Sequence, residues 1–136
     1  MNDNDLPNPK TGFVVTTLLI SRDVDKSRDF YERVFEAHVV MSGRPTILKL
    51  ANTWIIINDE GGPTDDKPQV RAAAPADPNI LSIALNLRVA DIQSLYTTWR
   101  ARGAEFLTEP KVHEREIRCY MRDPDGYLIE LGQLRS

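Results

Sequence analysis

Hydrophobic positions along the chain follow first a strand period and then a helix period, and this pattern occurs twice. The first occurrence begins with a run rich in Val, Thr, Leu and Ile over 13–21, which predicts a strand. Apolar residues then recur at helical spacing over 24–36, directly after Asp23 at the position of a helix N-cap. Apolar runs separated by turn residues predict further strands at 38–41, 46–50 and 54–57.

The second occurrence repeats this order. Residues 80–89 alternate between apolar and polar side chains, which predicts a strand with Ile83 on its apolar side. Asp91 is a second N-cap, and Gly103 stands where a glycine ends a helix. Short strands are predicted at 104–107, 117–121 and 127–131. The order strand, helix, strand, strand, strand therefore occurs twice, which indicates an internal repeat.

This repeat divides the chain into segments within one folded domain. We expect a flexible N-terminal tail over 1–12, a first module over 13–58 and a second module over 80–136. The segment between the modules, 59–79, is rich in proline and acidic residues. It is interpreted either as a linker between the halves or as a mobile loop that covers a ligand.

Composition narrows the class of protein but not its chemistry. A chain of 136 residues with 41% hydrophobic and 27% charged residues is typical of a globular domain with one core. The net charge of −3 argues against a general nucleic-acid binder, and the longest apolar stretch is far too short to span a membrane. The N-terminus does not resemble a signal peptide, and a single cysteine excludes an internal disulfide. We therefore expect a cytoplasmic protein with neither a nucleic-acid nor a membrane partner.

Three segments of the chain carry a resemblance to a known superfamily. They are 21–31, with its Phe-Tyr pair, 101–106 at the end of the second helix, and 123–131, with Asp-Pro-Asp-Gly before an apolar strand. In these segments and in its doubled order, the sequence resembles the vicinal oxygen chelate superfamily, which includes glyoxalases, bleomycin-resistance proteins and extradiol dioxygenases. The resemblance implies an α+β fold of two tandem βαβββ modules, whose mixed, curved sheets form an open cup, and it implies a homodimer.

The resemblance also implies a divalent metal ion held by ligands from several strands of the cup. Glu130 matches the ligand of the last strand. The other expected ligand positions carry no suitable side chain. They fall on Thr16 or Thr17 in the first strand and on Ala84 or a neighbour in the second module. The position in the fourth strand lies within 55–58, which ends at Asn58 and contains no Glu or Gln. Neither histidine, His38 or His113, matches a ligand position, although His113 could still reach the pocket. The metal site is therefore degenerate, and a divalent metal is disfavoured as a cofactor, with Glu130 as its one remaining ligand.

Strand alternation predicts a polar face near the expected pocket. Glu116, Arg118, Tyr120 and Arg122 alternate with Ile117, Cys119 and Met121, so the polar set is expected to share the concave face with Asn86, Arg88 and Glu130. Arg118 and Glu130 form either an ion pair that only satisfies both groups, or part of a binding site. In the second case Arg88 or Arg118 receives an anionic or carbonyl oxygen, and Tyr120 or Trp54 stacks on a ring. Core packing is the alternative for Trp54, and Cys119 is expected to be a small apolar filler.

Two functions are compatible with these residues, so whether the protein is an enzyme stays open. The first is a small-molecule-binding protein with a degenerate metal site, which sequesters an aromatic or cationic ligand as the bleomycin-resistance branch does. The second is a glyoxalase- or dioxygenase-type enzyme, in which Glu130 serves as metal ligand or general base on a small oxygenated substrate. In both cases the expected partners are a small molecule and a second copy of the chain.

Overall fold

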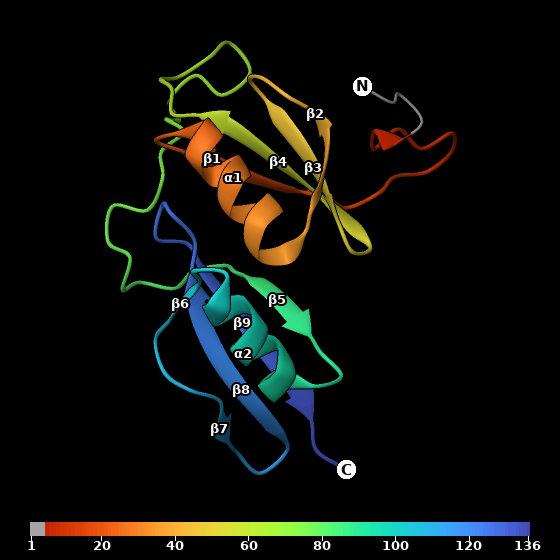
Figure 1. Ribbon diagram of the computed structural model, residues 1–136. Coiled ribbons are helices and arrows are strands. Elements are labelled where there is room, and N and C mark those ends of the chain that lie inside the picture. The colour runs from red at the N-terminus through yellow and green to blue at the C-terminus, as the bar shows by residue number, and fades with distance from the viewer. Residues whose placement is uncertain (1–4) are drawn as a thin grey trace. The chain divides into compact units, whose positions relative to one another are not determined.

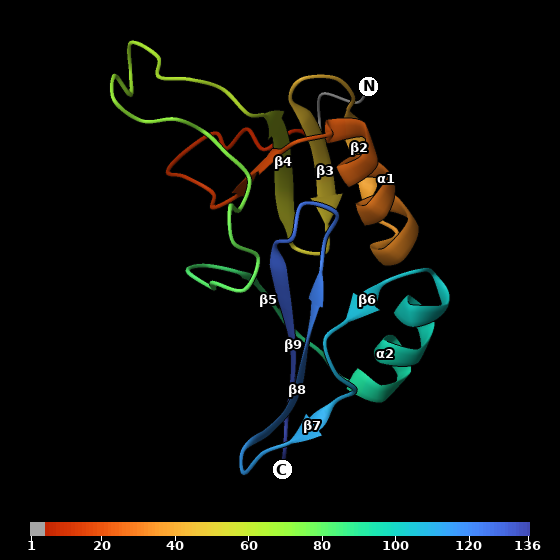
Figure 2. The ribbon, with the colours of Figure 1, turned by 90° about the vertical axis from the view of Figure 1, so that its left-hand side faces the viewer.

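The computed structural model describes residues 5–136, so the predicted N-terminal tail falls partly outside it. The chain forms two compact units, one up to Ala74 and one over 75–136, each with one helix against one mixed sheet (Figures 1 and 2). The first unit contains β1 (Thr17–Ser21), α1 (Val24–Phe35), β2 (His38–Met41), β3 (Thr46–Leu50) and β4 (Thr53–Asp59). The second contains β5 (Leu85–Arg88), α2 (Ile92–Ala101), β6 (Glu105–Phe106), β7 (Lys111–Val112), β8 (Glu116–Arg122) and β9 (Leu128–Leu134).

The two sheets have the same topology. Their strand orders are β1-β4-β3-β2 and β5-β9-β8-β6, with the short β7 paired to β8. In each sheet the first strand runs parallel to the last, and the remaining pairs are antiparallel. The predicted α+β fold of two tandem βαβββ modules with mixed sheets is therefore confirmed. No helix in the described part of the chain is long and apolar enough to cross a membrane.

Both helices begin at the predicted capping residue. The side chain of Asp23 accepts a hydrogen bond from the backbone N–H of Lys26, and that of Asp91 accepts one from Ser94, each at 3.1 Å. These bonds satisfy one of the N–H groups that the first turn of a helix leaves without a partner. Past the end of α2, Gly103 has φ +97°, a left-handed conformation that glycine adopts without strain.

The core of each unit lies between its helix and one face of its sheet. In the first unit α1 contacts β3 and β4, and in the second α2 contacts β9. The buried residues alternate along β4, β8 and the first half of β9, whereas β3 buries three residues in succession. They include Leu48, Ile55, Ile57, Cys119, Met121, Ile129 and Leu131. The residues between them point to the opposite face of each sheet, and this face carries the candidate site in the second unit.

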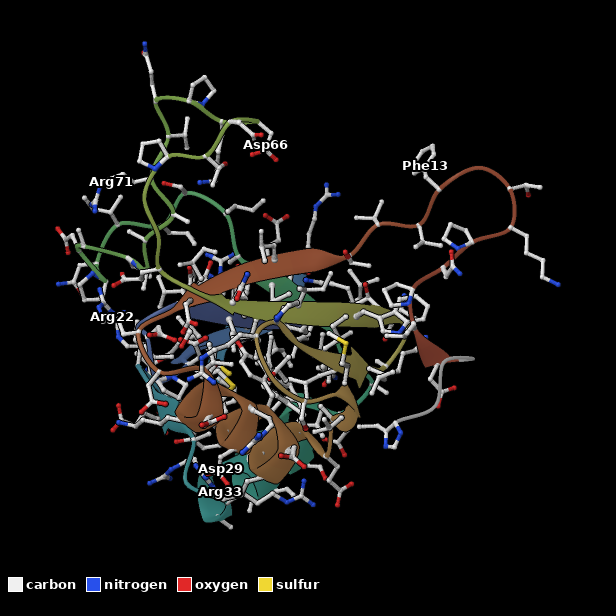
Figure 3. The ribbon with its side chains drawn as sticks, turned by 90° about the horizontal axis from the view of Figure 1, so that it is seen from above. Phe13, Arg22, Asp29, Arg33, Asp66 and Arg71 are labelled. Atoms are coloured by element: carbon white, nitrogen blue, oxygen red, sulfur yellow. The ribbon has the colours of Figure 1, made fainter. Side chains whose placement is uncertain are left out.

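The predicted first strand of each module is shorter than its sequence pattern, as is the strand expected over 104–107, which covers only Glu105–Phe106. The first begins at Thr17 rather than residue 13, and Figure 3 shows Phe13 directed away from the sheet. The strand predicted over 80–89 covers only Leu85–Arg88, and Ile83, expected on its apolar side, is 88% exposed. The length of β1 is limited by its partner β4, which begins at Thr53, and that of β5 by its partner β9, which begins at Leu128. The residues before β1 and β5 therefore have little strand backbone to pair with.

The segment after β4 has internal structure of its own. The backbones of Gly61 and Ala72 exchange hydrogen bonds of 3.0 and 2.9 Å, and the N–H of Ala74 donates to the carboxylate of Glu60 at 2.9 Å. Figure 3 shows Asp66 at the far end of this loop and Arg71 next to its tied ends. The ends of the loop are thus tied together, and whether it covers a ligand stays a prediction.

Candidate ligand-binding site

A group of polar side chains lies on the face of the second sheet opposite α2. Strands β5, β8 and β9 place them there by the same alternation that buries Met121 and Ile129 on the helix side. We call this group the polar face; its members are Asn86, Arg88, Glu116, Arg118, Tyr120 and Glu130. The structure therefore brings together the residues that strand alternation predicted to share one face, except Arg122, whose guanidinium donates to the backbone oxygen of Pro78 and to the side chain of Asn79.

Glu130 is the centre of one half of the polar face. Its cross-strand neighbours are Asn86 on β5 and Tyr120 on β8. The amide of Asn86 donates to Oε1 at 2.6 Å, and the hydroxyl of Tyr120 donates to Oε2. The Glu130 side chain is only 18% exposed, so these bonds offset the cost of burying its charge. The hydrogen bond to this carboxylate, aided by burial, raises the pKa of Tyr120 above its ordinary value.

Glu116 is the centre of the other half. Nη2 of Arg88 lies 2.9 Å from its Oε2, and Nη1 of Arg118 lies 3.3 Å from its Oε1. The hydrogen bonds from Arg88 and Arg118 hold the pKa of Glu116 below its ordinary value. Of the two alternatives for Arg118, the ion pair with Glu130 is not the one found: Arg118 contacts Glu116, while Tyr120 lies opposite Glu130 and Arg118 opposite Gly132.

Gly132 makes room for Arg88 to cross β9. It is the cross-strand neighbour of Arg88 on one side and of Arg118 on the other. A Cβ atom at this position would lie 2.7 Å from Cζ of Arg88 and closer still to Nη1, so any side chain would collide with the guanidinium. The missing side chain lets Arg88 reach Glu116 while its Nη1 lies 3.9 Å from Oε1 of Glu130. The sequence signal for this role is a glycine two residues after Glu130, on the same face of the strand.

Comparison with known proteins identifies the family. A family model described as the Glyoxalase/Bleomycin resistance protein/Dioxygenase superfamily matches residues 13–131. The chain belongs to this superfamily. A relative, the metallothiol transferase FosB of Shouchella clausii, is 29% identical over 112 residues, which cover 80% of this chain and 71% of that protein.

Solved structures of the superfamily share the fold. A glyoxalase/bleomycin resistance protein/dioxygenase from Nocardioides has a TM-score of 0.73 at 17% identity, covering 93% of this chain and 86% of that one. A lactoylglutathione lyase from Agrobacterium tumefaciens has 0.68 at 21%, covering 93% and 95%. The fosfomycin resistance protein FosX from Listeria monocytogenes has 0.67 at 18%, covering 92% and 95%. At these identities the likeness supports the fold and leaves the chemistry to the residues.

The two superfamily modules differ sharply at equivalent positions. Leu18 precedes the N-cap Asp23 by five residues, as Asn86 precedes Asp91. Leu18 pairs with Ile56, which pairs with Ile47 on the next strand. The corresponding chain of neighbours in the second module is Asn86, Glu130 and Tyr120. The same backbone arrangement thus carries three aliphatic residues in one module and a hydrogen-bonded polar group in the other.

The remaining predicted residues lie outside the polar face. Trp54 is half-buried on the face of the first sheet away from Ile55 and Ile57; its Nε1 donates to the backbone oxygen of Asp5 at 2.6 Å, and Lys49 Nζ lies 3.6 Å from the ring centroid. A role for Trp54 in ligand stacking stays a prediction.

The histidines and the cysteine occupy different environments. His38 and His113 are exposed, and the role of His113 in a pocket stays open. Cys119 is buried, and burial raises the pKa of its thiol to about 11. Its predicted place as an apolar filler is confirmed.

The residues present do not fit the divalent metal ion that the superfamily implies. Glu130, the matching ligand, already accepts hydrogen bonds at both oxygens and has the guanidinium of Arg88 beside it. Within residues 5–136 no three His, Cys, Asp or Glu side chains are grouped so that they could hold a metal ion. The positive charge of Arg88 beside Glu130 weakens the attraction of this carboxylate for a divalent cation.

Proposed function

We propose that this chain binds a small organic molecule on the polar face and that it does so without a resident divalent metal ion. The observation that carries the proposal is the contrast between the modules. Leu18, Ile47 and Ile56 occupy the first module in the register that Asn86, Tyr120 and Glu130 occupy in the second. Because the fold accommodates aliphatic side chains at all three positions, folding does not require the polar ones, and ligand recognition is a reason to have them.

The polar face offers a defined set of groups to such a ligand. Arg88 and Arg118 can donate to an anionic or carbonyl oxygen, and Glu130 can accept from a hydroxyl or amine. Two arginines and two glutamates leave the polar face without net formal charge, so its own charge does not select between a cation and an anion. An aromatic part of the ligand would stack on the ring of Tyr120.

The experiment exchanges the chemistry of one module for that of the other. A triple variant, Asn86→Leu, Tyr120→Ile and Glu130→Ile, is expected to fold, since apolar replacement of a complete polar group is often neutral for stability. Small molecules are screened by thermal shift on the wild-type chain with a chelator present, and ligands found are titrated into the triple variant. Loss of binding by a folded variant supports the proposal. Unchanged binding contradicts it, as do ligands that a parallel screen without the chelator finds and the chelator removes. Glu105→Gln on β6 is the control.

We also propose that the protein is a cytoplasmic homodimer, as the resemblance implies. The net charge of −3 supports the absence of a nucleic-acid partner. Size-exclusion chromatography over a range of protein concentrations tests the dimer. Elution as a monomer throughout that range would contradict it.

A second candidate function is proton-transfer catalysis by Glu130. The observation that favours it is the hydrogen bond from the Tyr120 hydroxyl to a largely buried carboxylate. In this role Glu130 takes a proton from the carbon beside a carbonyl group, and Arg88 receives the negative charge that moves to the carbonyl oxygen. Deuterium uptake from D2O into small carbonyl compounds tests this candidate. Uptake that is lost in Glu130→Gln supports it, and uptake equal to the rate without protein contradicts it.

A further inference from the structure

Two arginines from different strands converge on one carboxylate of the polar face. Arg88 extends from β5 and Arg118 from β8, and both are cross-strand neighbours of Gly132. Each contacts a different oxygen of Glu116, at 2.9 Å and 3.3 Å. A carboxylate held between two guanidinium groups is the arrangement by which proteins bind carboxylate ligands, except that here the carboxylate belongs to the chain itself.

We propose that Arg88 and Arg118 form a seat for a carboxylate group of the ligand, and that Glu116 occupies this seat when no ligand is bound. This inference rests on the proposed function, because it assigns a chemical class to the molecule bound at the same face. The ligand would be an organic acid, whose carboxylate replaces that of Glu116 between the two guanidinium groups.

The geometry leaves both arginines able to accept such a ligand. Their side chains are 45% and 41% exposed, so solvent reaches each guanidinium while it contacts Glu116. Each guanidinium carries five N–H donors in a planar fork that matches a carboxylate. Gly132 adds no side chain between them, which leaves the space above β9 to the guanidinium of Arg88. The seat is therefore open on one side and provided with more donors than Glu116 uses.

Glu116 acts in this arrangement as a tethered competitor. A carboxylate attached to the same chain has an effective concentration of about millimolar, so a free carboxylate must exceed it or bind through additional contacts. Without Glu116, two positive charges would face each other across Gly132, and an external anion would relieve their repulsion. Removing the charge of Glu116 should therefore raise the affinity for organic acids, and removing either arginine as well should cancel this gain.

The experiment titrates benzoate and acetate into the isotope-labelled chain and follows its amide NMR signals. In Glu116→Gln we expect at least about tenfold tighter binding of benzoate than in the wild type, a change of about 1.4 kcal/mol. Adding Arg88→Ala or Arg118→Ala to this variant should return the affinity to the wild-type level or below. The control is Glu114→Gln, which removes the same charge two residues away, where the side chain is exposed.

Three results would overturn the inference. They are equal affinities in Glu116→Gln and the wild type, equal gains in Glu116→Gln and Glu114→Gln, or a gain that survives the loss of either arginine. Amide dispersion shows that each variant is folded, and Glu116→Ser serves as a second variant if Glu116→Gln does not fold. A ligand that binds the wild type and is unaffected by every seat variant overturns the seat but not the proposed function. If Glu116→Gln binds benzoate but the wild-type screen finds no ligand, the proposed function is overturned and the seat is not.

Discussion

Replacing Gly132 by alanine tests how Arg88 is held on the polar face. The new Cβ would lie 2.7 Å from Cζ and 3.0 Å from Nη2 of Arg88, where ordinary contact begins at 3.4 Å. The backbone of Gly132 is outside the left-handed region, so alanine causes no backbone strain there. The guanidinium is the end of a flexible side chain, and we expect it to move rather than the strand. Its hydrogen bond to Glu116 at 2.9 Å would then be lost, and because solvent reaches this ion pair the loss adds little to the cost.

The expected size of the effect follows from two opposing contributions. Glycine inside a strand is less stable than alanine by about 0.5–1 kcal/mol, so the substitution by itself stabilises. Forcing the Arg88 side chain out of its preferred rotamer costs about 0.5–1.5 kcal/mol. When Arg88 is present, these two contributions nearly cancel, so Gly132→Ala alone changes the free energy of unfolding little. In an Arg88→Ala background only the gain remains, so the coupling between the two sites is about 1 kcal/mol.

A double-mutant cycle measured by urea unfolding provides the assay. It compares the wild type, Gly132→Ala, Arg88→Ala and the double variant. The matched control combines Gly132→Ala with Arg118→Ala. Arg118 is also a cross-strand neighbour of Gly132, but the three atoms nearest to the new Cβ all belong to Arg88. We expect coupling with Arg88 and additivity with Arg118. Coupling with Arg88 below about 0.3 kcal/mol, which is the ordinary limit of additivity, would refute the reasoning.

Three further predictions concern single residues. Glu130→Gln should lower the pKa of Tyr120 toward 10.0, as seen in a tyrosinate absorbance titration with Tyr120→Phe as reference; an unchanged pKa would contradict the hydrogen bond. Because folding raises this pKa, the stabilisation from Tyr120 should be complete below pH 10.0 and be lost as pH rises through the folded value. The thiol of Cys119, with a pKa of about 11, should resist a thiol reagent in the folded chain and react after unfolding; equal rates would show that it is accessible. Asp91→Ala should lower the free energy of unfolding by about 1 kcal/mol in urea, and no change would mean that α2 does not depend on its cap.

The features predicted well from the sequence are those with local causes. Asp23 and Asp91 are recognisable as N-caps because the bond each side chain forms is only three residues long. Alternation along β8 places Tyr120 on the open face and Met121 in the core because neighbouring side chains of a strand point to opposite sides. The polar face could be predicted for the same reason.

Features that depend on a distant strand could not be predicted. Residues 80–84 have a strand-like pattern, but a strand also requires a partner, and β9 begins too late to supply one. Alternation indicates the face on which Arg118 lies but not the residue opposite it, so it could not decide whether Arg118 pairs with Glu130. The place of Gly132 on the face of Glu130 can be read from the sequence, but its contact with Arg88 follows from the path of Arg88 across β9, which no local pattern contains.

The turn between β8 and β9 has a consequence for the order in which the polar face assembles. Oδ1 of Asp123 accepts hydrogen bonds from the N–H groups of Asp125 and Tyr127, and the two strands then pair over their full length. Such a hairpin closes a short loop, whereas β5 must find β9 from more than 40 residues away. We therefore expect Tyr120 and Glu130 to meet early in folding, and the arginine and amide of β5 to join them last. Pulse-labelling hydrogen exchange would show β5 protected after the hairpin, and binding competence should appear only with that final step.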